Sequence, residues 1–216
     1  MRRLIQTEVM KPAGLAAVTT ALVCYPRIAL WHTPYPAWYL ELDLLLGSFV
    51  LWAFVFAWHP PCAGRPVFQF PMSPRRFAGA TFAGLFLGAV LYGILDPTLR
   101  ARTPADYPTS LGEWCAMTLF ALAFHPLFLI FAPLAWALRL FRRLWIAIAL
   151  TLLFGVFVLV IKTQSAPTPL PPAVFMELVG LRLAHGSLAL LFYLRGGVLL
   201  VWWWLFLVQS RHLLTL

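Results

Sequence analysis

The sequence predicts an all-α integral membrane protein, a single domain built as a bundle of seven transmembrane helices. Two features of the composition indicate this class: 62% of the 216 residues are hydrophobic and 11% are charged. Soluble domains average about 45–50% apolar and about 25% charged residues. The third observation is that the apolar residues form runs close to the ~20 residues that a helix needs to cross a bilayer.

Short polar or proline-rich loops separate the apolar runs. We expect spans at residues 14–31, 38–58, 77–95, 111–138, 144–161, 173–194 and 198–209. The first span ends at a tight turn with two prolines, and a proline-rich loop over residues 59–73 follows the second. The third span contains Gly84 and Gly88, a G-x-x-x-G spacing that lets another helix approach closely. A polar loop is expected after it, from Asp96.

The fourth predicted span is the longest. Ser110 and Glu113 fit a capping box at its start. As a continuous helix, residues 111–138 would extend roughly 42 Å, so the segment must tilt or bend. Pro126 and Pro133 supply the bend, because each removes a backbone donor. If the chain splits or re-enters at Pro126, the count becomes eight spans and the later spans invert.

The last three spans differ in polarity. Residues 144–161 carry no charge, whereas residues 173–194 contain Glu177, Arg182 and His185. Between them, residues 162–172 are rich in proline and should not be helical. Gly196-Gly197 then turns the chain into the last span, which holds three consecutive tryptophans.

The distribution of Lys and Arg predicts the orientation. With the N-terminus inside, ten of these residues fall on the inner side, four on the outer side and two within spans. This favours a protein of the bacterial inner membrane with a cytoplasmic N-terminus. Because the basic residues lie in short loops between spans, the net charge of +9 indicates contact with anionic lipid of the bilayer, and we expect no nucleic-acid partner.

Several ionisable side chains fall inside the predicted spans, where each costs at least about 2.5 kcal/mol. We expect structural ion pairs between helices from the set Arg27, Glu41, Asp43, Glu177 and Arg182. Arg27 faces Glu41 and Asp43 across one tight turn, which favours an ion pair within that hairpin. Arg182 and His185 are three residues apart and share a helix face. The alternative interpretation is a polar cavity for a ligand or a proton.

Two histidines are the candidates for binding a cofactor. His125 and His185 each have an imidazole nitrogen that can ligate a metal or a chlorophyll-type pigment, or hydrogen-bond a neighbouring helix. The sequence His59-Pro60-Pro61-Cys62 contains metal-ligand residue types, but no second pair accompanies it. We therefore predict no metal site and no cofactor, with a pigment or metal as the alternative.

The region from Ser110 onward resembles the CAAX-protease and bacteriocin-processing (CPBP) membrane family. The shared features are a long apolar helix, an arginine-rich hinge, a tryptophan and a further apolar helix with Phe-Gly, here Arg139, Arg142, Arg143, Trp145, Phe154 and Gly155. Arg195-Gly196-Gly197-Val198 is similar to the family's Arg-Thr-Gly-Ser turn. The resemblance covers roughly the C-terminal half of the chain.

The catalytic residues of that family have no counterparts here. His125-Pro126 stands at the position of its Glu-Glu pair and Ile130 at that of its Arg. At the positions of the family's His, His and Asn stand Val158, Phe206 and Ser210. The resemblance therefore implies a protease-like scaffold without protease chemistry.

We interpret the chain as a non-catalytic CPBP-like scaffold or accessory subunit of a larger membrane complex, in contact with other membrane subunits. Two alternatives remain. The first is a divergent intramembrane protease that uses Glu113, His125, Glu177 and His185, which would have to converge on one water-accessible cavity. The second is a pigment- or cofactor-binding subunit with His125 or His185 as ligand.

Overall fold

The computed structural model describes residues 4–31, 33–103, 107–164 and 171–216. Within these ranges the fold is all-helical, as predicted, and six helical segments are long and apolar enough to cross a membrane. They are Thr7–Ile28, Ala37–Ala63, Pro74–Ala101, Leu111–Phe141, Leu144–Gln164 and Pro172–Thr215. The last of these segments contains both of the last two predicted spans, which meet at a kink at Gly197.

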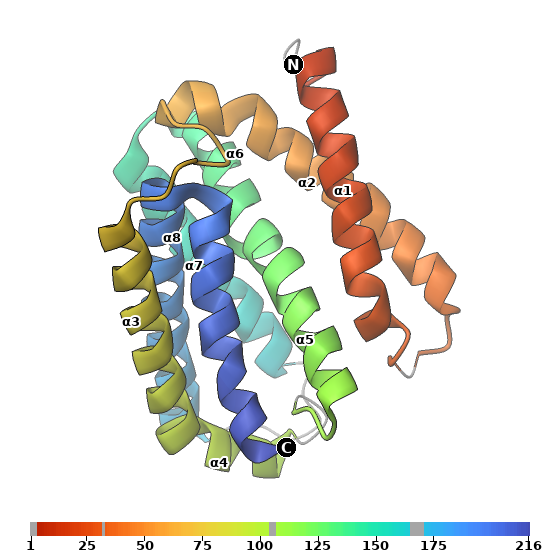
Figure 1. Ribbon diagram of the computed structural model, residues 1–216, viewed down its shortest axis with the longest axis vertical. Helices are drawn as coiled ribbons and strands as arrows, with labels where there is room; N and C mark the ends of the chain where they lie inside the picture. Colours follow the sequence, from red (N-terminus) through yellow and green to blue (C-terminus); the bar gives the residue numbers. More distant parts are fainter. Residues whose placement is uncertain (1–3, 32, 104–106, 165–170) are drawn as a thin grey trace.

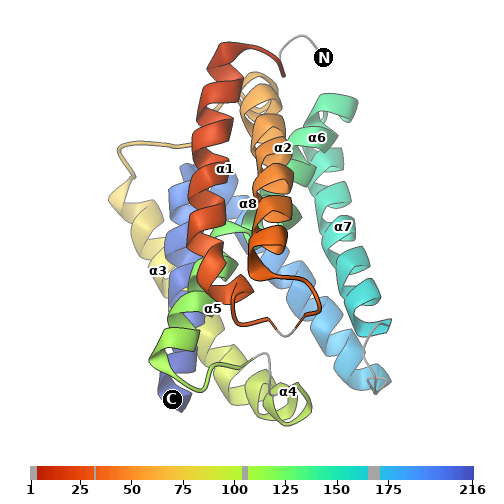
Figure 2. The same ribbon diagram turned by 90° about the vertical axis from the view of Figure 1, so that its right-hand side faces the viewer.

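Helices α1 (Thr7–Ile28) and α2 (Ala37–Ala63) pack side by side at one edge of the bundle (Figure 2). The Trp52 indole donates a buried hydrogen bond of 3.0 Å to the Thr20 hydroxyl and ties the two helices together. The prediction of a loop from residue 59 is wrong, because α2 continues through Pro60 and Pro61. It ends at Gly64 (φ 66°), so the two prolines remove donors only from its last turn.

The third segment consists of α3 (Pro74–Val90), a π-helical turn (Leu91–Leu95) and α4 (Asp96–Arg102). The helix therefore extends through residues that the sequence placed in a polar loop. A Cβ atom on Gly84 would lie 2.9 Å from the Leu207 Cβ atom and 3.0 Å from the Trp204 carbonyl oxygen. The close helix approach predicted from the G-x-x-x-G spacing is confirmed, and the partner is α8.

The fourth segment is built from α5 (Leu111–Ala123), a π-helical turn (Leu127–Phe131) and α6 (Ala132–Phe141). The Ser110 hydroxyl accepts from the Glu113 amide at 3.3 Å, and the Glu113 carboxylate accepts from the Thr109 amide at 2.7 Å. The predicted cap at this end is thus present. The chain does not reverse at Pro126 (Figure 1), because the π-helical turn accommodates the local bend.

The last two helices are α7 (Leu144–Gln164) and α8 (Pro172–Gln209), followed by a 3₁₀ turn (Ser210–Thr215). Helix α8 breaks at Gly197, which has φ 69° and ψ −166°. The rings of His185 and Trp204 lie 4.7 Å apart, whereas a straight helix would separate these residues by about 28 Å. Helix α8 is therefore a hairpin, with a first arm (172–196) and a second arm (198–209) (Figure 1).

The loop between α2 and α3 holds the α8 turn in place. The Val198 amide donates to the Val67 carbonyl at 3.0 Å. The guanidinium groups of Arg65 and Arg76 donate to the carbonyls of Leu194 and Arg195, which lie at the end of the first arm. These carbonyls have no partner within the helix at such an end, so the two arginines cap the first arm and fix the direction of the second.

Candidate functional site

A cavity of about 250 Å³ lies between α5, α7, the third segment and both arms of α8. Most of its lining is apolar, with leucines from every one of these segments except α5. Eight polar or ionisable residues also line it: Asp96, Tyr107, His125, Thr151, Arg182, His185, Gln209 and Arg211. The bundle thus encloses a polar region within segments long enough to span the membrane.

Arg182 supplies the charge in the middle of this cavity. It lies ten residues after Pro172, about 15 Å along the first arm of α8. Its stem packs beside Gly155 of α7, where a Cβ atom would lie 3.6 Å from the Arg182 Cδ atom, an ordinary van der Waals distance. Among the residues with a described position, none forms a hydrogen bond or ion pair with the Arg182 guanidinium. A guanidinium presents five N–H donors in a planar fork, and Arg182 lines the cavity with no acceptor for them among the described residues.

His185 and His125 line the cavity from two different helices. His185 lies three residues after Arg182 on the same face of α8, with its ring against Trp204. His125 lies at the end of α5, with its ring 5.2 Å from that of Phe120 in an edge-on contact. His125 is exposed and His185 is partly buried. The structure therefore brings together three of the residues that the sequence singled out: His125, Arg182 and His185.

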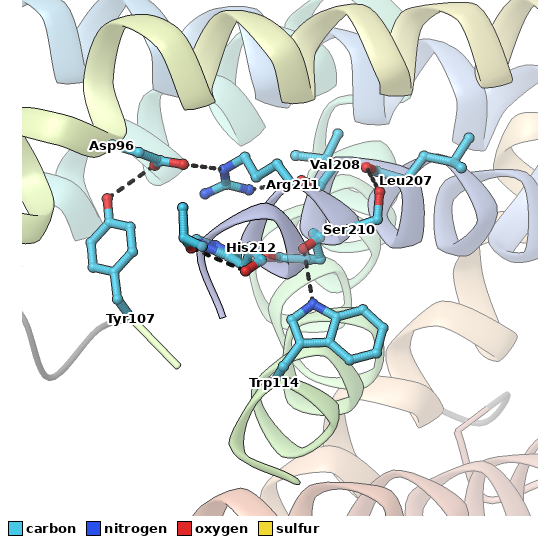
Figure 3. A network of polar contacts seen from close by, with 10 residues as sticks. Asp96, Tyr107, Trp114, Leu207, Val208, Ser210, Arg211 and His212 are labelled. Carbon is cyan, nitrogen blue, oxygen red and sulfur yellow. Dashed lines mark hydrogen bonds and ion pairs between the residues drawn. The ribbon is translucent and has the colours of Figure 1, made fainter. Parts of the chain in front are cut away.

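An ionic cluster closes the end of the cavity near the C-terminus (Figure 3). The Arg211 Nε atom donates to the Asp96 Oδ2 atom at 2.9 Å, and the Tyr107 hydroxyl donates to Oδ1 at 3.0 Å. Arg211 also donates from Nη1 to the Val208 carbonyl at 2.9 Å. A second pocket of about 340 Å³ lies beside the cluster and is lined by Tyr92, Arg100 and Asp96 among others.

The sequence did not predict the ion pair between Asp96 and Arg211. The sequence predicts a loop at Asp96, and the predicted topology puts this loop and Arg211, near the C-terminus, on the same side of the membrane. Their placement on the same side of the membrane was the one sequence feature that hinted at the pair. It could not identify the pair, because three other basic residues were assigned to the same side.

The remaining predicted site residues lie outside the cavity. Glu113 caps α5 through Thr109, and Glu177 is exposed on the first arm of α8. The protease hypothesis required both carboxylates and both histidines around one cavity, and the structure gathers only the histidines. In addition, no three His, Cys, Asp or Glu side chains form a metal-binding group in the described part of the chain.

The predicted structural ion pairs are not formed in the described ranges. Arg27 is partly buried in α1 and Asp43 is exposed on α2. Glu41 has a carboxylate oxygen that is buried without a hydrogen-bond partner. Arg182 does not pair with Glu177, because residues five apart point about 140° away from each other around a helix. The ion pair that the described residues do form joins Arg211 and Asp96.

No protein-family model, curated protein or solved structure matches the chain.

Proposed function

We propose that the protein is a non-catalytic membrane protein that binds an anionic amphiphile, with the headgroup at Arg182 and the start of the chain among the cavity leucines. The observation that carries this proposal is the Arg182 guanidinium, which lines an apolar cavity inside a spanning helix without an acceptor among the described residues. A charge at such a depth is costly unless it is paired, and an anionic ligand supplies the pairing group.

The charges around the cavity favour an anion. Arg182 and Arg211 are its two arginines and Asp96 is its one acidic residue. Because Asp96 accepts hydrogen bonds from Arg211 and Tyr107, one positive charge is left over, at Arg182. Charge-assisted hydrogen bonds from a guanidinium to a carboxylate or phosphate are roughly twice as strong as neutral ones. An anionic headgroup therefore gains more here than a neutral or cationic one.

The size and lining of the cavity favour a slender ligand. Pockets that enclose drug-sized molecules measure about 300–1,000 Å³, and this cavity measures about 250 Å³. It has room for a compact headgroup and part of one chain. A pigment macrocycle ligated by His125 or His185 would need a wider cavity, so the geometry supports the pigment alternative less well.

The orientation of the bundle completes the proposal. We take each arm of α8 as a separate crossing, which gives seven crossings with a cytoplasmic N-terminus in a bacterial inner membrane. The loop after α2, the α6–α7 junction and the α8 turn lie at the N-terminal end of the bundle, whereas the C-terminus lies at the opposite end (Figure 1). These three connections and the helix ends beside them carry seven arginines, Arg65, Arg75, Arg76, Arg139, Arg142, Arg143 and Arg195, as cytoplasmic loops and their flanks typically do.

Titration of the purified protein in phosphatidylcholine nanodiscs tests the ligand class. The probes are hexadecyl phosphate and hexadecanoate as anions and hexadecyltrimethylammonium as the cation, with bound probe counted by native mass spectrometry. We expect at least one anion to bind and the cation not to bind. Arg182→Met removes the guanidinium but keeps an apolar stem, and should weaken anion binding about 10- to 100-fold, since hydrogen bonds to charged groups contribute about 1.5–3 kcal/mol.

The matched control is Arg139→Met, which makes the same substitution on an exposed residue of α6 and should leave binding unchanged. The proposal fails if wild-type protein binds neither anion. It also fails if Arg182→Met and Arg139→Met bind the anions equally well.

One observation favours the second candidate, an accessory subunit of a membrane complex. A shallow, almost entirely apolar groove lies between α2, α6 and α7, lined by residues such as Leu51, Phe54, Pro133, Trp136 and Phe154. Such a groove suits a transmembrane helix of another subunit. Purification from the native membrane in mild detergent tests this: a stable monomer without a companion protein would count against it. The resemblance to the CPBP family stays a prediction from sequence.

A further inference from the structure

We infer that the headgroup bound in this cavity is a phosphomonoester, and that His125 and His185 distinguish it from a carboxylate or a phosphodiester. The inference rests on the proposed function, because it names the chemical class of the anion at Arg182. It follows from the number, the kind and the placement of the hydrogen-bonding groups around the cavity.

The polar groups without a partner come from three places in the fold. Arg182 and His185 project from one face of the first arm of α8, His125 comes from the end of α5, and Gln209 ends the second arm. No hydrogen bond engages the side chain of any of the four within the ranges the structure covers. By contrast, the Thr151 hydroxyl, which also lines the cavity, donates to the Ala147 carbonyl at 2.7 Å.

A carboxylate would use only part of this set. Its two oxygens accept from the guanidinium and can accept further hydrogen bonds, but they cannot donate one. The accepting nitrogen of each neutral imidazole would then stay without a partner in a cavity lined mainly by leucines. Leaving polar groups unpaired in apolar surroundings is unfavourable. A phosphodiester has the same limitation, because it also presents two free oxygens and one charge.

A phosphomonoester matches Arg182 and both histidines. It presents three terminal oxygens, so Arg182 can take two of them while an imidazole N–H donates to the third. A neutral imidazole also has one nitrogen that accepts, and the P–OH group of the monoanion can donate to it. Two histidines on different helices therefore supply both the donor and the acceptor that a carboxylate does not need.

In a bilayer, the site must distinguish its ligand from the ordinary lipids that surround it. The surrounding membrane consists largely of phosphodiester lipids with two chains, which compete for any exposed arginine. A cavity of about 250 Å³ has room for a compact headgroup and the start of one chain. The size of the cavity and the hydrogen-bonding groups thus both select a single-chain phosphomonoester against the excess of ordinary lipid.

Competition in phosphatidylcholine nanodiscs tests the inference. Hexadecyl phosphate and hexadecanoate are titrated separately, then hexadecyl phosphate is challenged with phosphatidylglycerol and with excess inorganic phosphate. We expect hexadecyl phosphate to bind at least about tenfold more tightly than hexadecanoate, a difference of about 1.4 kcal/mol, and neither competitor to displace it. Displacement by inorganic phosphate would instead assign the site to the free anion and overturn the inference of a lipid.

A histidine variant identifies the residues responsible. The double substitution His125→Phe with His185→Phe keeps an aromatic ring at both positions and should reduce the phosphate preference to below about threefold, with hexadecanoate binding unchanged. His59→Phe is the control, because His59 is buried outside the cavity with its ring 4.6 Å from that of Tyr193.

The possible failures are distinct. If neither anion binds, the proposed function itself is wrong. If both anions bind equally well to wild-type protein, only the inference about the phosphomonoester is wrong. The inference is also wrong if the double variant keeps the full preference for hexadecyl phosphate over hexadecanoate. If that variant does not fold, the ratio of the two affinities in wild-type protein still tests the preference for a phosphomonoester.

Discussion

Asp96 and Arg211 are 115 residues apart in the sequence, and their side chains form an ion pair of 2.9 Å. Asp96 begins α4 and Arg211 lies just beyond the second arm of α8, so the pair joins the third segment to the C-terminal end of the chain. Both side chains are largely buried, 9% and 14% exposed respectively. The Tyr107 hydroxyl donates to the second carboxylate oxygen, so each oxygen of Asp96 accepts a hydrogen bond.

The first prediction concerns this pair. Asp96→Asn leaves the Arg211 guanidinium without its counter-charge in a mostly buried position, so we expect the free energy of unfolding in detergent to fall by about 1–3 kcal/mol. A double-mutant cycle with Arg211→Gln should give a coupling energy of about 1 kcal/mol or more. Asp43→Asn, on an exposed residue of α2, is the control and should change stability by less than about 0.5 kcal/mol. A coupling energy near zero would show that the contact does not stabilise the fold.

The second prediction concerns the packing of α3 on α8. Gly84→Ala places a methyl group 2.9 Å from the Leu207 Cβ atom and 3.0 Å from the Trp204 carbonyl oxygen, so the helices must separate. We expect a loss of about 1–3 kcal/mol in the free energy of unfolding, measured as a lower thermal midpoint in detergent. Gly79→Ala, on the same helix with no atom within 4 Å, should be neutral or slightly stabilising. Equal midpoints for the two variants would contradict the close approach.

The third prediction concerns the α8 turn. Gly197 has φ 69°, and a Cβ atom there would lie 2.5 Å from the Val67 carbonyl oxygen. With ψ −166° this backbone conformation is one that essentially only glycine adopts, so Gly197→Ala should lower the free energy of unfolding by about 1–3 kcal/mol or more. Gly180→Ala is the control within the same helix, because nothing lies within 4 Å of its Cβ position. If Gly197→Ala retains wild-type stability, the hairpin does not depend on this glycine.

The fourth prediction tests whether the two arms of α8 cross the membrane separately. One variant keeps only Cys62, which is exposed at the end of α2, and a second carries only Leu214→Cys, at an exposed position near the C-terminus. With seven crossings and a cytoplasmic N-terminus, a membrane-impermeant maleimide added to intact cells should label the second variant and not the first. Labelling of the first variant alone would indicate the inverted topology. Labelling of neither would indicate that both sites are cytoplasmic, as six crossings require.

Several features were predictable because they depend on local residues. The lengths of the apolar runs determine how many helices can reach across a bilayer. Ser110 and Glu113 cap α5 through their own neighbours, and Gly196-Gly197 turns the chain because Gly197 adopts a positive φ without strain. The G-x-x-x-G spacing predicted a close approach of another helix, although it did not identify α8 as that helix.

The charge pairs were not predictable in the same way. We expected Arg27 to pair with Glu41 or Asp43, which lie close to it in sequence, whereas the pair that forms joins Asp96 to Arg211. In a soluble protein the polar face of a helix shows which side is exposed. In this bundle the surfaces toward lipid and toward protein are both apolar, so the sequence pattern does not reveal how each helix is rotated.

The fold class and the positions of most helices could be derived from the residues along the chain, which also singled out His125, Arg182 and His185 among several ionisable candidates. That these three line one cavity, with Glu113 and Glu177 outside it and Asp96 and Arg211 at one end, follows from the packing of the helices. The physical reason is that helix formation in a membrane depends on apolar residues along a single segment. A cavity depends instead on how five segments are rotated and packed against one another.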